Sequence, residues 1–318
     1  MHTLLGITIS GLLVLAGQLP TKTTHQRLVL HFDVNKTIIA TDIVQGKALA
    51  QTINGILAEF TLFAWDGSVT ESYYAYVTRQ IARNHPNLSR ASEAFKHERS
   101  RLLREFPAYL EHHHPDLYKT YVTEAAHMVQ LLEAESPTIF PSFFKLIAWL
   151  NESDYRDRYV IHLRTFGQDL PEIVPVLEKR AQLAFSAFGI FREHKLHVGT
   201  DTDKAIYNSA QELYDILTSS GKNYAIQDDY QYWKISNFQA RGGKPFPIDL
   251  HDASVVALFF DDNANDLDKP IVCPITPQGS LESTERLIDL GTIVVVNPKE
   301  AILNEDYFIE KVKATLAF

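Results

Sequence analysis

Four short apolar segments constrain the fold of this chain more than any other feature of its sequence. All are rich in β-branched, aromatic or leucine residues, and they occupy residues 28–32, 159–163, 255–260 and 292–296. This composition is typical of strands that are buried on both faces of a parallel sheet. Helical patterns flank the second segment, at Phe143–Leu150 and Pro171–Phe185. Because strand and helix alternate, the sequence predicts an α/β fold with a doubly wound, Rossmann-like parallel sheet.

One long interval, residues 42–140, does not follow this alternation. It is helix-like and rich in aromatic and charged residues, as in "ESYYAYVTRQIARNH" and "YKTYVTEAAHMVQLLEAE". We therefore expect a helical cap at 42–140, inserted into a core made of residues 27–41 and 141–318. A smaller segment with turn signals, from about Lys195 to Pro247, is expected to be irregular.

The N-terminal 26 residues contain an apolar stretch from Leu4 to about Leu19. Its length suits a signal peptide or an anchor better than a full transmembrane helix, which needs about 20 apolar residues. No Lys or Arg precedes it, so an apolar segment packed on the domain is the alternative. A secreted or periplasmic location is slightly favoured over a cytoplasmic one, and no other stretch is expected to contact a membrane.

Composition excludes several classes of function. The 318 residues carry a formal net charge of −9, which argues against a nucleic-acid backbone as the partner. Cys273 is the single cysteine, so neither an intrachain disulfide nor a cysteine-rich zinc site can form. The sequence leaves the oligomeric state open.

Polar side chains follow three of the predicted strands, at the point where each strand ends. They are Asp33, Asn35 and Thr37 after the first, Thr165 after the second, and Asp261, Asp262 and Asp266 after the third. Ligands of open α/β sheets bind at the carboxyl ends of the strands. Two acidic clusters at one sheet edge would repel each other without a cation, and Mg²⁺ is the natural candidate because it binds carboxylates, water and substrate phosphate.

Four motifs in this order resemble those of the haloacid dehalogenase-like superfamily, which is dominated by magnesium-dependent phosphohydrolases. They are "LVLHFDVNKT", "YVIHLRT", the lysine of "RGGKPF" and "VVALFFDDNAND", which together span residues 28–266. Lys244 is the best match for the lysine, with Lys234 and Lys204 as rivals. The interval after the first motif also matches the position of a cap in that superfamily.

The resemblance implies a role for each motif residue. Asp33 would be the nucleophile that forms an aspartyl-phosphate from a small phosphorylated molecule. Thr165 and Lys244 would hold the phosphoryl oxygens, with Thr37 also on the substrate side. Mg²⁺ would be bound by Asp33, the backbone carbonyl of Asn35 and Asp262, while Asp261 and Asp266 would ligate it directly or orient its waters.

Asn35 departs from the pattern, because the superfamily usually has an aspartate there that protonates the leaving group and later activates water. An amide cannot exchange that proton at neutral pH, and losing general acid–base help costs about 10²–10⁴ in rate. The protein could prefer good leaving groups such as aryl or acyl phosphates, use another acid from the cap, or bind a phosphorylated ligand without turnover. Dehalogenation at carbon is the weakest alternative, because that reaction needs no metal.

Overall fold

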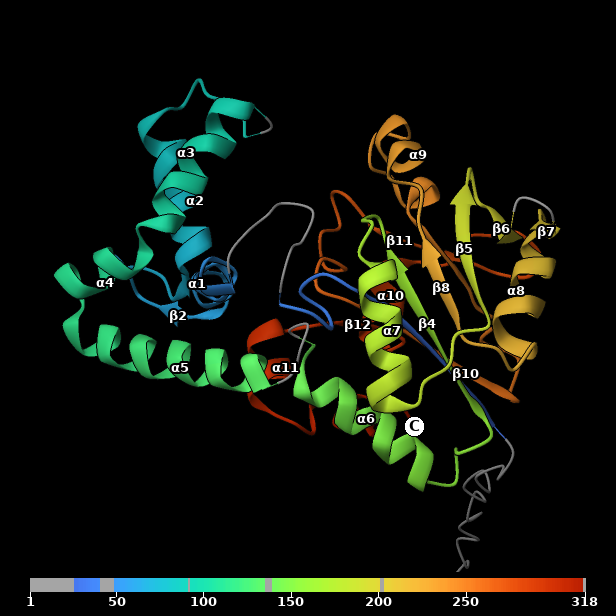
Figure 1. Cartoon of the computed structure of the whole chain (residues 1–318). Coiled ribbons are helices and arrows are strands. Elements are labelled where there is room, and N and C mark those ends of the chain that lie inside the picture. The colour runs from blue at the N-terminus through green and yellow to red at the C-terminus, as the bar shows by residue number, and fades with distance from the viewer. Residues whose placement is uncertain (1–25, 41–48, 91, 135–138, 201–202, 317–318) are drawn as a thin grey trace, which may run out of the picture.

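An eight-stranded sheet forms the centre of the computed structural model, which describes residues 26–40, 49–90, 92–134, 139–200 and 203–316 (Figure 1). The strand order is β12-β10-β1-β4-β8-β5-β6-β7. The strands are β1 (Arg27–Asp33), β4 (Tyr159–Thr165), β5 (Ala187–Arg192), β6 (Lys195–Thr200), β7 (Asp203–Tyr207), β8 (Tyr224–Gln227), β10 (Val255–Asp261) and β12 (Ile293–Val295). The four predicted core strands are confirmed as β1, β4, β10 and β12.

The sheet is mixed rather than wholly parallel as the sequence predicted. Strands β12 to β5 run parallel, whereas β5 with β6 and β6 with β7 pair antiparallel. The expectation of an irregular segment from Lys195 to Pro247 is therefore wrong in part, since β6, β7 and β8 lie within it. Strands β5, β6 and β7 have one side open to solvent, where Phe188 and Ile206 are exposed. They therefore lack the continuous apolar runs by which doubly buried strands are recognised. Strand β8 is buried but has only 4 residues.

Helices cover both faces of the sheet. On one face, Phe32 packs against Phe143 and Phe308. The helices on this face are α6 (Pro141–Glu152), α7 (Leu170–Ala181), α11 (Pro298–Leu303) and α12 (Tyr307–Leu316). On the other face, His31 packs against Phe246. That layer contains α8 (Ala210–Ser219), α9 (Tyr230–Ile235), η2 (Ala240–Gly242), α10 (Thr284–Asp289) and the parallel pair β9 (Lys244–Pro247) and β11 (Val272–Ile275).

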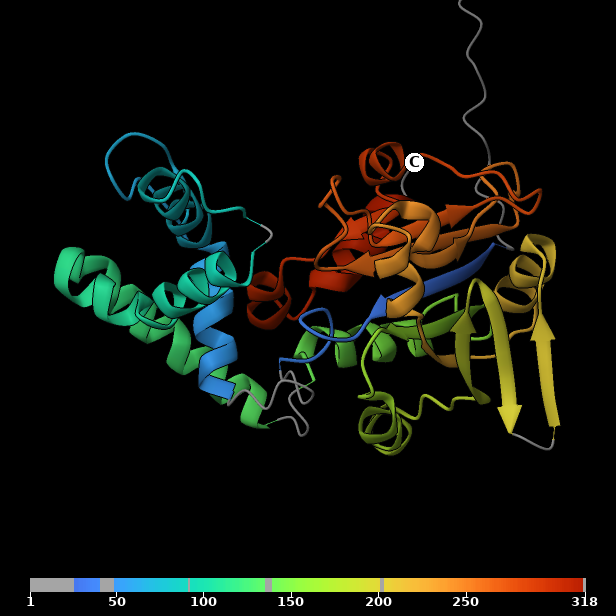
Figure 2. The same ribbon diagram turned by 90° about the horizontal axis from the view of Figure 1, so that it is seen from above.

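A unit of five helices lies between β1 and β4 in the chain and beside the sheet in space (Figures 1 and 2). We call it the helical insertion. It consists of α1 (Leu49–Phe60), β2 (Leu62–Phe63), β3 (Glu71–Ser72), α2 (Tyr73–Asn84), α3 (Glu93–Arg104), α4 (Phe106–His113) and α5 (Pro115–Ala134). Helices α1 and α5 pack on each other and on α11 of the core. The insertion has its own aromatic centre, where Trp65 contacts Tyr73 and Phe106.

The predicted N-terminal signal or anchor lies almost entirely outside the described residues, which begin at Gln26. Within the described part of the chain, no helix combines the length and the apolar character needed to cross a membrane.

The register of the central strands brings the polar ends together. Strand β1 lies between β10 and β4, with Phe32 opposite Phe260 on one side and Leu163 on the other. All three strands run in the same direction, so their carboxyl ends finish at one edge of the sheet. Asp33, Thr165 and Asp261 are the last residues of β1, β4 and β10.

Candidate functional site

A cavity of about 750 Å³ lies where this sheet edge faces the helical insertion. The core contributes Asp33, Asn35, Thr165, Lys244 and Asp262 to its wall. The insertion contributes Thr52, Glu59, Tyr74 and Arg104, among others. The volume falls in the range of small-molecule sites, which are about 300–1,000 Å³.

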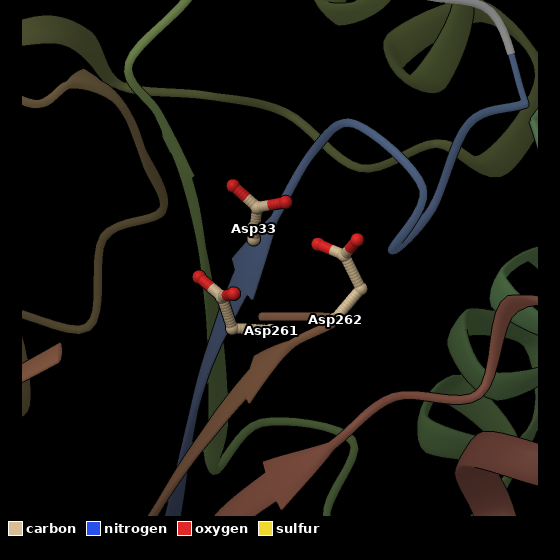
Figure 3. Close-up of side chains that lie close together, drawn as sticks. All are labelled: Asp33, Asp261 and Asp262. Carbon is tan, nitrogen blue, oxygen red and sulfur yellow. The ribbon is translucent and has the colours of Figure 1, made fainter. Parts of the chain in front are cut away.

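Three carboxylates gather on the core side of the cavity (Figure 3). Asp33, Asp261 and Asp262 each offer an oxygen that lies within 4.8 Å of the others. Burial and, to a smaller extent, the charge of Asp261 raise the pKa of Asp33 to about 7, although Lys244 opposes them. Burial, followed by the charges of Asp33 and Asp261, raises the pKa of Asp262 well above its usual value. Burial and mutual repulsion thus both disfavour the ionised forms of Asp33 and Asp262.

Lys244 is the cation within this cluster, and it is almost fully buried. Its Nζ lies 2.5 Å from Asp33 Oδ1 and 2.7 Å from Asp261 Oδ2. Burial alone would lower the pKa of Lys244, but Asp261, Asp33 and Asp228 raise it overall. The rival lysines, Lys204 and Lys234, are both exposed and are not part of this cluster. The geometry therefore brings Lys244, and neither rival, to the predicted nucleophile.

Thr37 lies between the loop that follows β1 and the loop that follows β10. Its hydroxyl donates to Asp33 Oδ2 at 3.1 Å and accepts the backbone N–H of Asp262 at 3.2 Å. The side chain is fully buried and does not line the cavity. In this arrangement Thr37 fixes the loop after β1 to the loop after β10, rather than facing a substrate.

The three carboxylates differ in their capacity to bind a metal. Both oxygens of Asp261 are engaged, by Lys244 Nζ and by the backbone N–H of Asn263. Asp262 accepts only from the Asn263 side chain at Oδ1, and its Oδ2 has no donor among the described residues. Both oxygens of Asp33 are likewise engaged, by Lys244 Nζ and by the Thr37 hydroxyl. Asp33 and Asp262 line the cavity and Asp261 does not, so these two carboxylates are the better placed to bind Mg²⁺, which prefers carboxylate oxygens.

Asp266 is separate from the acidic cluster. It is exposed in the turn after β10, where its Oδ1 accepts the backbone N–H of Lys269 at 3.2 Å. It is not among the carboxylates whose oxygens lie within 4.8 Å of one another, so its predicted part in binding a cation stays a prediction.

Thr165 and Lys244 are held by a buried ion pair that the sequence did not suggest. Arg164 donates to both oxygens of Asp228, and both side chains are fully buried. Arg164 also donates to the carbonyl of Pro245, next to Lys244, while the Asp228 N–H donates to the carbonyl of Thr165. The pair thereby ties β4 and the residue after β8 to β9.

Asn35 contacts a second residue that sequence reasoning missed. Its Nδ2 donates to Asp169 Oδ2 at 2.8 Å. The amide oxygen Asn35 Oδ1 and the second carboxylate oxygen, Asp169 Oδ1, are both buried without a hydrogen-bond partner among the described residues. An aspartate two residues before Pro171 looks like an ordinary helix N-cap, so the sequence gave no signal for this contact.

Comparison of the chain with protein-family models, with curated proteins and with solved structures found no match. A functional conclusion therefore depends on the residues and their geometry.

Proposed function

We propose that this protein is a Mg²⁺-dependent phosphohydrolase similar to the haloacid dehalogenase-like enzymes, and that it acts on a small phosphorylated molecule through an aspartyl-phosphate at Asp33. One observation carries the proposal. A buried carboxylate, a buried lysine, a threonine and a second acidic loop converge from three parallel strands and β9 on the floor of one cavity.

The charges suit phosphoryl transfer. A carboxylate can attack a phosphate dianion only if negative charge on both partners is neutralised. Lys244 contacts Asp33 directly, and Thr165 lies at the same edge with its hydroxyl beside the Gly167 N–H, at 2.8 Å. Mg²⁺ held by Asp33 and Asp262 would supply the remaining positive charge. Asp33 Oδ2, held by Thr37, would be presented to the phosphorus.

The strand order and the helical insertion agree with the resemblance. The strand that bears Asp33 is flanked by those that bear Thr165 and Asp261, and the insertion follows the first motif directly. Because the insertion supplies the far wall of the cavity, we propose that it is a cap that excludes water and selects the substrate.

A binding protein without turnover is the second candidate function, and Asn35 is the observation that favours it. A site of this kind would keep the charges that hold a phosphoryl group but would lack a carboxyl beside the leaving group.

The deciding experiment is hydrolysis of 4-nitrophenyl phosphate by the full chain, with Mg²⁺ or with EDTA, beside an Asp33→Asn variant. Turnover that requires both Mg²⁺ and Asp33 supports the phosphohydrolase. The exposed Asp116→Asn change on α5 is the matched control and should leave the rate unaltered.

An Asn35→Asp variant separates the two candidates. If the parent binds Mg²⁺ and phosphate but turns over only after this change, the natural protein is a binding protein. If neither protein binds Mg²⁺ in a calorimetric titration, the site assignment itself is wrong.

A further inference from the structure

Asp169 is a buried carboxylate that does not perform the usual task of its position. It is the N-cap residue of the 12-residue helix α7, yet its side chain makes no capping hydrogen bond. It is almost completely buried, and the bond that it does make is the one accepted from the Asn35 amide. The carboxylate thus accepts a hydrogen bond from Asn35, which lines the cavity, instead of capping its own helix.

The backbone is shaped to leave room for this contact. A Cβ placed on Gly167 would lie 2.3 Å from Asp169 Oδ2 and 3.2 Å from Thr165 Oγ1. Only glycine can therefore occupy this position while Asp169 stays where it is. The Asp169 carboxylate and the Thr165 hydroxyl consequently both lie close to Gly167, which lines the cavity.

The hydrogen bond fixes which end of the Asn35 amide is free. Its N–H donates to Asp169, so the acceptor Oδ1 is the atom left without a partner. A buried acceptor without a donor costs about 1–3 kcal/mol, which a ligand or a water with an O–H group would relieve. Residue 35 can then accept a hydrogen bond in the cavity, but it has no proton to give to a departing oxygen.

We propose that Asp169 is a positioning residue that holds the Asn35 amide with its oxygen toward the bound phosphoryl group, and that this pair restricts the site to phosphoryl donors whose leaving group departs without a proton. The inference rests on the proposed function. A site restricted in this way would select acyl phosphates and aryl phosphates with electron-poor rings, and it would exclude simple alkyl phosphates.

Both steps balance without an acid at residue 35. In the first, an Asp33 oxygen bonds to phosphorus while the bond from phosphorus to the leaving oxygen breaks, and the leaving group departs as a carboxylate or phenolate with the electron pair. In the second, water bonds to phosphorus, the bond to Asp33 breaks with its electron pair returning to the carboxylate, and the released phosphate keeps both protons of the water. Asn35 Oδ1 accepts a hydrogen bond from that water and orients it.

The test is a leaving-group series of acetyl phosphate, 4-nitrophenyl phosphate, phenyl phosphate and ethyl phosphate, each with Mg²⁺. The parent should lose kcat/KM steeply as the leaving group becomes more basic. The double variant Asn35→Asp/Asp169→Asn exchanges amide and carboxylate, so it conserves the hydrogen bond and the net charge. It should raise kcat/KM for ethyl phosphate by about 10²–10⁴ and change it little for acetyl phosphate.

The Asp169→Asn single variant tests positioning alone. It allows the Asn35 amide to turn either way, so kcat for acetyl phosphate should fall with little change in KM, because water is oriented less often. Asp116→Asn again serves as the control for loss of a carboxylate and should leave the whole series unchanged.

The outcomes distinguish this inference from the function beneath it. If 4-nitrophenyl phosphate is hydrolysed in an Asp33-dependent way but ethyl phosphate is hydrolysed equally well, the restriction by Asn35 and Asp169 is refuted and the phosphohydrolase stands. The positioning role is refuted if Asp169→Asn behaves like the parent across the series. If no donor is hydrolysed and none labels Asp33, both proposals fail.

Discussion

Replacing Lys244 with methionine tests the charge arrangement of the site most directly. The change keeps most of the side-chain volume and removes the ammonium that lies 2.5 Å from Asp33 and 2.7 Å from Asp261. Breaking a buried ion pair by removing one partner costs about 3–5 kcal/mol, because the remaining charge is left uncompensated. We expect the free energy of unfolding in EDTA to fall by about that amount, since two carboxylates lose their partner.

Urea unfolding followed by circular dichroism, in EDTA and in Mg²⁺, measures this effect. Lys244→Met leaves more negative charge around the proposed cation site, so Mg²⁺ should stabilise it more than it stabilises the parent. Lys234→Met is the matched control, since it removes an exposed lysine on α9 and should change neither stability nor hydrolysis. The double variant Lys244→Met/Asp261→Asn should recover part of the lost stability, because both partners are then neutral, but none of the hydrolysis.

Two results would refute this reasoning. If Lys244→Met and Lys234→Met unfold at the same urea concentration in EDTA, the buried charges of Asp33 and Asp261 do not depend on Lys244. If Lys244→Met retains the parental rate with 4-nitrophenyl phosphate, the lysine has no part in holding the phosphoryl group.

Three further predictions concern the surroundings of the site. Gly167→Ala should lower both the free energy of unfolding, by about 1–3 kcal/mol, and the rate of hydrolysis, because its Cβ would displace the Asp169 carboxylate; urea unfolding and initial rates measure the two effects. Burial lowers the pKa of His162 from 6.5 to about 4 in the folded protein, so the unfolded chain takes up a proton at this imidazole at a higher pH than the folded chain does. The free energy of unfolding should therefore fall by up to about 3 kcal/mol between pH 6.5 and pH 4, and a His162→Gln variant should lack this part of the pH dependence. Asp262→Asn should weaken Mg²⁺ binding by at least about 10–100-fold, the loss that changes around a metal ligand typically cause, while Asp266→Asn should weaken it far less; calorimetric titration compares the two.

The strand ends were predictable because a single physical rule governs them. A short apolar run followed at once by an acid indicates a buried parallel strand that ends at the ligand-binding edge, and Asp33 and Asp261 both satisfy this rule. The choice of Lys244 over Lys234 could be predicted only through the resemblance. Nothing in the local sequence says which of these lysines is buried beside Asp33.

Contacts between distant side chains were not predictable from one sequence. Asn35 and Asp169 are 134 residues apart, and Arg164 and Asp228 are 64 apart. Each of these residues is compatible with an ordinary local role, such as a cap or a strand residue, and only the fold shows which partner it meets. The antiparallel end of the sheet was missed for a related reason, since its strands are open to solvent on one side and lack a continuous apolar run.

The acidic cluster is itself an argument for a function at this edge of the sheet. Apolar residues of similar size would often stabilise a protein interior more than buried ionic groups do. Here burial and mutual repulsion raise the pKa values of Asp33 and Asp262, so a bound cation would favour the ionised forms of both carboxylates. Sites that break the rules of stable packing are where function is expected. A phosphohydrolase and a phosphate-binding protein would both need this cluster, so the charges alone do not decide between them. In the proposed reaction a basic leaving group would need a proton donor at residue 35, where the structure has an amide that donates a hydrogen bond to Asp169, so the decision depends on this residue.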